Sequence, residues 1–392
     1  MSSTNLRAIA LTLLLATGCA SGLTMVGPIA AEAAGGVRPQ VGKPLEAAIA
    51  AANRGNASEA NAAVRQAESV SGLTAAEQQA IAQTKNYIAA KTGNFSGGGG
   101  SATAAAAKFA ADYNAGRYTA VTGEDVDLLK KYNAFTPQDQ IIVAQAYYLS
   151  GRAAQAVTYL KPLVSGPHPS QDALNLLQSA AYKAGDNDTL RFALEKLVTS
   201  YPSQKSWGDL LQLSENAKGL RDRQTLNLYR LRLRTGTMKT ADDYTTAAEM
   251  ALEYGSAAEA ANFVQKGLDA KVLSGDRAQK LLNTAKAQDA ETQANFAKLA
   301  AAADKARTGD DAINLGEELS GAGRFQDAIN EIQKGIQKGA TDKGDAQIEL
   351  GLAYLGAGQK DAAISAFNAV PQQDTNNAMI AHLWAIYAKN SH

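Results

Sequence analysis

The chain has 392 residues, and its 38 lysines and arginines balance its 38 aspartates and glutamates. A balanced charge offers no electrostatic attraction to nucleic acid, so we expect no nucleic-acid partner. The single cysteine, Cys19, lies close to the amino terminus, and aromatic residues make up 6% of the chain. Disulfides are therefore excluded as a source of stability, and the core must come from the packing of small side chains.

The amino-terminal segment has the form of a secretory signal peptide. Arg7 precedes an uncharged stretch over residues 8–31, and Ala31-Glu32-Ala33 provides a small-residue cleavage site. We expect residues 1–33 to be removed, giving a periplasmic or secreted bacterial protein with no membrane span after cleavage. Two alternatives stay open. The uncharged stretch is long enough to remain as a membrane anchor, and Cys19 follows Leu15-Ala16-Thr17-Gly18, which partly resembles a lipoprotein lipobox.

The rest of the chain reads as helical throughout. Residues 34–95 predict a small amino-terminal segment, with two or three short helices over residues 45–91. A glycine run at residues 97–100, flanked by serines, has the composition of a flexible linker, so we place a linker at residues 96–102. Residues 103–392 then predict helices of about 12 to 15 residues separated by short breaks.

Glycines recur along the chain at a nearly constant interval. Gly151, Gly185 and Gly219 are each 34 residues apart (185−151 and 219−185), whereas the glycine due near Asp289 is missing. The series comprises Gly55, Gly93, Gly116, Gly151, Gly185, Gly219, Gly255, Gly323 and Gly358. A period of this length is typical of a helical solenoid. We therefore expect an all-α solenoid of stacked antiparallel helix hairpins.

The last two copies of the repeat are the most regular. Gly316 and Gly351 are 35 residues apart, as are Gly323 and Gly358. The final copy runs Leu350-Gly351-Leu352-Ala353-Tyr354 through Gly358 to Ala362-Ala363-Ile364 and Phe367. This pattern resembles the tetratricopeptide repeat (TPR). Because glycine within a helix is unfavourable, Gly316 and Gly351 also predict positions where a facing helix leaves no room for a Cβ.

The resemblance implies a concave inner face lined by the first helix of each hairpin, which binds a protein or peptide. When the positions of the TPR pattern are carried over to this chain, amide, aromatic and charged side chains fall on that face. The implied partner-binding residues are Gln138, Gln145, Tyr148, Asn175, Lys183, Asp209, Asn216, Glu249 and Glu253.

Five arginines cluster between residues 221 and 234. On a continuous helix Arg223, Arg230 and Arg234 fall within about 40° of one another and form one stripe. Two interpretations stay open. The stripe is either a solvated outer face whose arginine stems cover apolar surface, or a site for an acidic peptide or a phosphorylated glycolipid.

The chain contains no recognisable catalytic, metal or cofactor motif. The three histidines, His168, His382 and His392, include no pair four residues apart, and the glycine run at 97–100 lacks the lysine of a P-loop. We therefore expect no catalytic residues, no metal and no cofactor. The leading hypothesis is a non-enzymatic scaffold that binds a protein or peptide in the cell envelope. The alternatives are a superhelical module of a lytic transglycosylase-like enzyme and a lipid-anchored outer-membrane assembly factor.

Overall fold

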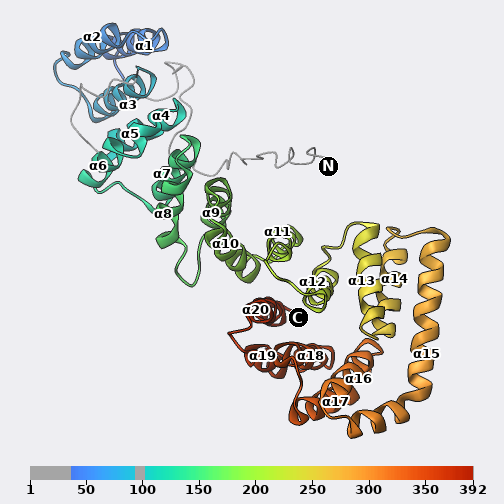
Figure 1. The fold of residues 1–392 in the computed structure, drawn as a ribbon. Helices are drawn as coiled ribbons and strands as arrows, with labels where there is room; N and C mark the ends of the chain where they lie inside the picture. The colour runs from blue at the N-terminus through green and yellow to red at the C-terminus, as the bar shows by residue number, and fades with distance from the viewer. Residues whose placement is uncertain (1–36, 93–101, 392) are drawn as a thin grey trace. The chain divides into compact units, whose positions relative to one another are not determined.

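The computed structural model describes residues 37–92 and 102–391, and every regular element within these ranges is an α-helix (Figure 1). The predicted all-α class is confirmed. The predicted signal peptide, residues 1–33, and most of the predicted linker, residues 96–102, lie outside the described residues. Helices α3 (Ala75–Thr92) and α4 (Ala102–Asn114), on either side of that linker, contact each other. A boundary at the linker stays a prediction.

The chain forms two compact units, divided between Asp139 and Gln140. The helices of the first unit are α1 (Pro39–Asn53), α2 (Ala57–Glu68), α3, α4, α5 (Tyr118–Val121) and α6 (Glu124–Lys131). The first three confirm the predicted short helices over residues 45–91. Val41, Leu45, Val64, Ile81 and Ile88 are buried between them.

The second unit stacks helix hairpins. Its chain begins within α7 (Pro137–Leu149) and continues through α8 (Ala153–Leu163), α9 (Gln171–Ala184), α10 (Asn187–Ser200), α11 (Gln204–Glu215), α12 (Asp222–Thr235), α13 (Ala241–Glu253) and α14 (Ala257–Asp269). It ends with α15 (Gly275–Lys305), α16 (Asp310–Gly321), α17 (Phe325–Lys338), α18 (Lys343–Gly356), α19 (Lys360–Asn368) and α20 (Thr375–Asn390). The unit is a solenoid in which most helices pair with the next helix in the chain.

The turn glycines explain where hairpins form and where one does not. Gly185 ends α9 with φ of 71°, and Gly358 follows α18 with φ of 76°. Both adopt the left-handed conformation that glycine reaches without a steric penalty. Near Asp289, where the sequence lacks this glycine, the helix does not turn. Instead α15 runs unbroken for 31 residues.

The two packing glycines lie at close helix contacts, as predicted. A Cβ on Gly351 would lie 2.6 Å from Cδ1 of Phe367 on α19, and one on Gly316 would lie 3.1 Å from Cδ1 of Ile332 on α17. Neither distance leaves room for a side chain larger than hydrogen. These contacts explain why the two most regular repeats keep glycine inside a helix.

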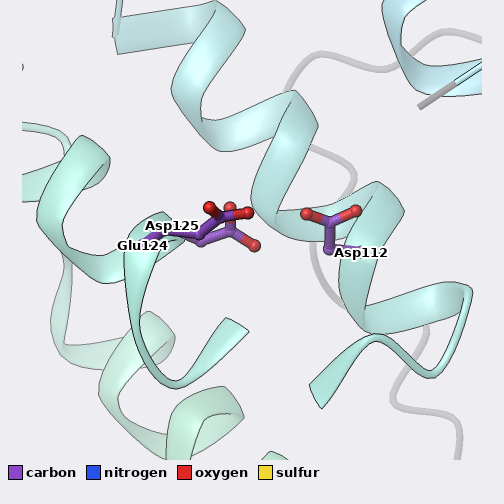
Figure 2. Close-up of side chains that lie close together, drawn as sticks. All are labelled: Asp112, Glu124 and Asp125. Atoms are coloured by element: carbon purple, nitrogen blue, oxygen red, sulfur yellow. The ribbon is translucent and has the colours of Figure 1, made fainter. Parts of the chain in front are cut away.

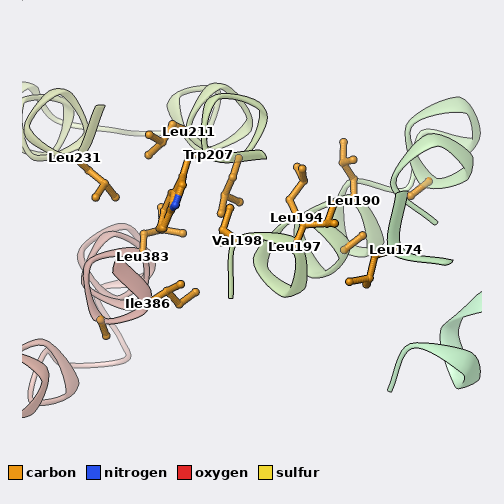
Figure 3. Packing of buried hydrophobic residues seen from close by; sticks show 14 of the residues in the cluster. Leu174, Leu190, Leu194, Leu197, Val198, Trp207, Leu211, Leu231, Leu383 and Ile386 are labelled. Carbon is orange, nitrogen blue, oxygen red and sulfur yellow. The ribbon is translucent and has the colours of Figure 1, made fainter. Parts of the chain in front are cut away.

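After α15 the chain returns to its own earlier helices. Helix α20 contacts α10 and α12. Trp384 and Asn390 of α20 bond to Asn227 and Val198, which lie 157 and 192 residues earlier in the sequence. Figure 3 shows Leu383 and Ile386 of α20 close to Trp207, Leu211 and Leu231 of α11 and α12. One buried apolar cluster therefore joins the middle of the second unit to its carboxyl-terminal end.

Candidate interaction surfaces

The first surface lies on α7, α9 and α11, the first helices of three successive hairpins. We call it the open face, and define it by Gln145, Tyr148, Asn175, Lys183, Asp209 and Asn216. Asn175, Lys183 and Asn216 are exposed, whereas the other three are partly exposed. The ammonium of Lys183 lies 4.8 Å from the centre of the Tyr148 ring, which is within the range of a cation–π interaction. The structure therefore brings these two predicted residues together across α7 and α9.

Other predicted residues on this face pair with their neighbours. Asp209 Oδ2 accepts a hydrogen bond from Gln178 Nε2 of α9 at 2.9 Å and lies 2.6 Å from Lys205 Nζ. Asn216 Nδ2 donates to the carbonyl oxygen of Gln212, one turn earlier, at 2.8 Å. Asp209 thus links α9 to α11, whereas the amide of Asn216 satisfies its own helix.

Three predicted residues lie elsewhere. Gln138 is exposed in the first turn of α7, on the first unit's side of the division. Glu249 and Glu253 are exposed on α13, and Glu249 Oε1 lies 3.4 Å from an Nη atom of Arg277 on α15. No observation tests the binding role of any of the nine residues, which therefore stays a prediction.

The arginine stripe of α12 is the clearest departure from the sequence-based interpretations. Arg223 and Arg230 do not lie on a solvated outer face, and their acidic partners belong to the same chain. Arg230 is only 6% exposed, and the two guanidinium groups contact carboxylates of α14, α16 and α18. Arg234, the third member of the stripe, is exposed. We call the acceptor residues Glu317, Asp345, Glu349 and Asn377 the closed face.

Arg230 makes the denser set of contacts. Its Nη1 donates to Glu349 Oε1 at 2.6 Å and to Asn227 Oδ1 at 2.7 Å. Its Nε and Nη2 donate to the two carboxylate oxygens of Glu259, both at 2.7 Å, and Nη2 also contacts Glu317. The guanidinium therefore bridges α12, α14, α16 and α18, with the bidentate geometry that favours arginine over lysine.

Arg223 lies two turns earlier on the same helix. Its Nη1 donates to Glu317 Oε2 at 2.8 Å and to Asp345 Oδ2 at 3.0 Å, and its Nη2 donates to Asn314 Oδ1 at 2.9 Å. The guanidinium carbon also lies 4.7 Å from the centre of the Tyr254 ring. Glu317 thus receives both arginines, one on each carboxylate oxygen.

Polar groups of α20 also form hydrogen bonds with α12. The indole nitrogen of Trp384 donates to the backbone carbonyl of Asn227 at 3.3 Å, and Gln224 Nε2 donates to Asn377 Oδ1 at 3.1 Å. Gln224 is the residue found where the repeat pattern expects a small alanine. Its amide fits here because a buried asparagine of α20 accepts its hydrogen bond.

The electrostatics of this cluster follow from burial and from an excess of acids. Burial raises the pKa of Asp345 to about 6 and that of Glu349 to about 8, and the neighbouring carboxylate of Glu317 adds to both shifts. Burial alone would lower the pKa of Arg230, but Glu259, Glu349 and Glu317 raise it well above its usual value. The arginines therefore stay charged, whereas the acids compete for two cations.

The spacing from the turn glycine of each repeat could have identified two closed-face residues. Glu317 lies six residues before Gly323, as Gln145 lies six before Gly151 (323−317 and 151−145). Asp345 lies 13 residues before Gly358, as Gln138 lies 13 before Gly151 (358−345 and 151−138). Extending the inner-face frame to the last two repeats would therefore have identified both acids. Their pairing with α12 is not visible in the spacing.

The first unit contains a compact acidic group formed by Asp112, Glu124 and Asp125, whose side chains point toward one another in Figure 2. One carboxylate oxygen from each lies within 4.8 Å of the others. Lys108 Nζ lies 2.7 Å from Asp112 and 3.1 Å from Glu124, and it also contacts Asp125. The lysine already supplies a cation to all three acids, so this group is an ion-pair cluster.

No protein-family model and no curated protein matches the chain. Among solved structures, the chain is similar to the maize pentatricopeptide repeat protein PPR10, with 13% identity over 88% of this chain and 57% of that one, at a TM-score of 0.29. It is also similar to the TPR domain of P58(IPK), with 12% identity over 90% of this chain and 99% of that one, at a TM-score of 0.22.

A third similar structure is the Cut9–Hcn1 hetero-tetramer of the APC/C, with 12% identity over 80% of this chain and 70% of that one, at a TM-score of 0.23. Since these scores are low, the solenoid architecture rests on the helices described above. Within the described ranges, no helix combines the length and apolar character needed to cross a membrane. Over the residues that the structure describes, the chain is an all-α solenoid of helix hairpins.

Proposed function

We propose that this protein is a non-enzymatic scaffold that binds a protein or peptide through the open face of α7, α9 and α11. The observation that carries the proposal is the difference between two comparable surfaces. The first helices α16 and α18 present acids that are buried against arginines of the same chain, whereas on the open face Asn175 and Lys183 are exposed and Tyr148 is partly exposed. Such groups can bind a peptide backbone and its side chains.

Two buried carboxylates of the second unit are not placed for catalysis. Glu317 and Glu349 are each 2% exposed and bond to arginines. An acid held in this way cannot contact a sugar or acyl substrate, because a general acid or base must reach the reacting atom. The buried acids are therefore structural partners of α12.

The setting that we propose is the bacterial cell envelope, on the basis of the signal-peptide pattern over residues 1–33. Intact-mass analysis of the exported protein tests it directly. The expected mass corresponds to a chain that begins at Ala34. A mass showing a diacylglycerol on Cys19 would instead place the protein at a membrane surface.

The binding proposal is tested by affinity capture from an envelope extract. The test variant replaces Gln145, Tyr148, Asn175 and Lys183 with alanine. The matched control variant replaces exposed residues on the adjacent helix α8, namely Gln155, Thr158 and Lys161. Captured proteins are identified by mass spectrometry, and binding is then repeated with the purified candidate. Circular dichroism confirms that each variant is folded.

The proposal requires that a specific partner binds the parent and the α8 control but not the open-face variant. Equal recovery by all three proteins would show that the open face is not the binding site. Clearing of peptidoglycan by the purified parent in a zymogram would show that the protein is an enzyme, and would contradict the scaffold proposal as a whole.

A further inference from the structure

The carboxyl-terminal hairpins hold a segment of their own chain, α12, through buried ion pairs. Helices α16 and α18 are the first helices of their hairpins, and α20 follows them in the same stack. Their contacts across the unit are made with α10, α11, α12 and α14 of earlier hairpins. The contact therefore joins the carboxyl-terminal hairpins to the middle of the same solenoid.

The occupant, α12, has a defined chemical pattern. Arg223, Asn227 and Arg230 lie at positions i, i+4 and i+7, which places all three on one face of the helix. All three bond to the closed face: Arg223 and Asn227 to Asp345, and Arg230 to Glu349. Leu228 and Leu231 of α12 belong to the apolar cluster that includes α20.

The acids at this contact outnumber the arginines that satisfy them. Glu317, Asp345 and Glu349 of the closed face and Glu259 of α14 surround Arg223 and Arg230, so the closed face alone, when fully ionised, carries one negative charge more than the two arginines balance (3−2). Buried carboxylates that lack a full counter-charge are costly. The closed face is therefore more acidic than its present occupant is basic, and it favours cationic helices.

The covalent connection between the two partners has little buried surface of its own. Only α15 and its flanking loops join α14 to α16 along the chain. Of its 31 residues, four are buried: Ala278, Leu282, Ala285 and Ala303. None of the residues between Ala285 and Ala303 is buried, so α15 itself contributes little to the cost of opening. That cost comes from the apolar contacts of α20 with Leu228 and Leu231 of α12 and from the contact between α14 and α16.

We propose that the closed face is a second binding surface, specific for a helix that carries two arginines seven residues apart, and that α12 is its built-in occupant. An external helix of this kind binds when the carboxyl-terminal hairpins separate from α12. This surface is distinct from the open face, uses different residues, and takes a partner of different chemistry.

The test uses the full-length protein and a labelled synthetic peptide with the sequence of residues 221–235. In the parent, the tethered α12 competes with the peptide for the closed face at an effective concentration on the order of 1 mM. The double variant Arg223→Gln, Arg230→Gln leaves the acids without their counter-charges and favours opening. We expect this variant to bind the peptide at least about ten-fold more tightly than the parent, because the built-in competitor is weakened.

Two controls make the result specific. Arg234→Gln changes an exposed arginine on the same helix, so this variant should bind the peptide as weakly as the parent. A peptide with glutamine in place of the arginines at positions 223 and 230 should not bind the double variant. A folded double variant that binds neither peptide, or both equally, would overturn the proposal.

A second measurement covers the case in which the double variant does not fold. Hydrogen exchange is measured on the parent with the labelled peptide at about 1 mM, which matches the expected effective concentration of α12. Displacement by the peptide should accelerate amide exchange in α12, and the glutamine peptide should have no effect. Unchanged exchange in α12 at this concentration would overturn the proposal.

Discussion

The open and closed faces belong to the same solenoid, yet they satisfy their polar groups in opposite ways. On the open face, Lys183 is exposed and interacts with one aromatic ring, that of Tyr148. On the closed face, Glu317 and Glu349 are almost fully buried and bond to arginines from an earlier helix. A repeat architecture alone therefore does not determine whether an inner face is accessible, because a long unbroken helix can return the chain onto it.

Loss of Arg230 should have the largest effect. Replacing it with methionine leaves Glu259, Glu317 and Glu349 without their shared counter-charge in a buried site, which typically costs about 3–5 kcal/mol. We expect the free energy of unfolding, measured with urea, to fall by about that amount. The control Arg234→Met, at an exposed site of the same helix, should change it by less than about 0.5 kcal/mol. Equal effects would mean that the network contributes little.

The next largest effect is expected at Gly351. A leucine there would be forced against the Phe367 ring between α18 and α19, and overpacking of this kind costs about 1–3 kcal/mol. Thermal unfolding should therefore shift downward by several degrees. The matched control is Gly166→Leu, because no atom lies near the position of a Cβ at Gly166 and its backbone is not left-handed. A stability as high as that of the control would show that α18 can move away from α19.

A smaller effect is expected when the free energy of unfolding is measured as a function of pH. Burial raises the pKa of Glu318 from 4.5 to about 7, and the charges of Asp289 and Glu259 add to the shift. Since the pKa is higher in the folded state, the stabilisation is complete below about pH 4.5 and is lost as the pH rises through 7. We expect Glu318 alone to lower the free energy of unfolding by about 1–2 kcal/mol between roughly pH 5.5 and 8.5.

The variant Glu318→Gln separates this group from the closed face. It should remove the part of the pH dependence that belongs to the contact between α14 and α16, where Glu318 Oε2 accepts a hydrogen bond from the backbone nitrogen of Ala258. The raised pKa values of Asp345 and Glu349 act in the same direction and should remain. An unchanged pH profile in the variant would assign the whole effect to those two acids.

The smallest effect is expected on the open face. Lys183→Ala removes an exposed charge whose described interaction is with the Tyr148 ring, and such an interaction contributes about 0.5–1 kcal/mol at most. The urea midpoint should therefore barely move, whereas partner binding should weaken. A loss of stability as large as that caused by Arg230→Met would contradict the distinction between the two faces.

Local features of the fold were predictable because they depend on neighbouring residues. Turn glycines such as Gly185 and Gly358 mark helix ends through their positive φ, and Gly316 and Gly351 mark contacts within a hairpin. The missing glycine near Asp289 corresponds to the unbroken α15. In each case the cause lies within one repeat, so a periodic sequence reveals it.

The closed face was not predictable in the same way. Helical periodicity correctly placed Arg223 and Arg230 on one stripe, but their acidic partners on α16 and α18 lie 87 to 122 residues further along the chain. Contacts at that distance depend on the path of α15, which no local pattern describes. The open-face residues were placed by the repeat frame, and of these the structure joins Tyr148 to Lys183. Their role in binding stays a prediction.

Because α15 is one unbroken helix, its length determines how α16 and α18 are oriented toward α12. Repeat proteins ordinarily tolerate the gain or loss of material between repeats, since each unit contacts only its neighbours. Here an extra residue within α15 would rotate everything after it by about 100° and advance it by about 1.5 Å. The acids of α16 and α18 would then face away from α12. Insertions that are harmless in a surface loop would therefore disconnect the two ends of this unit.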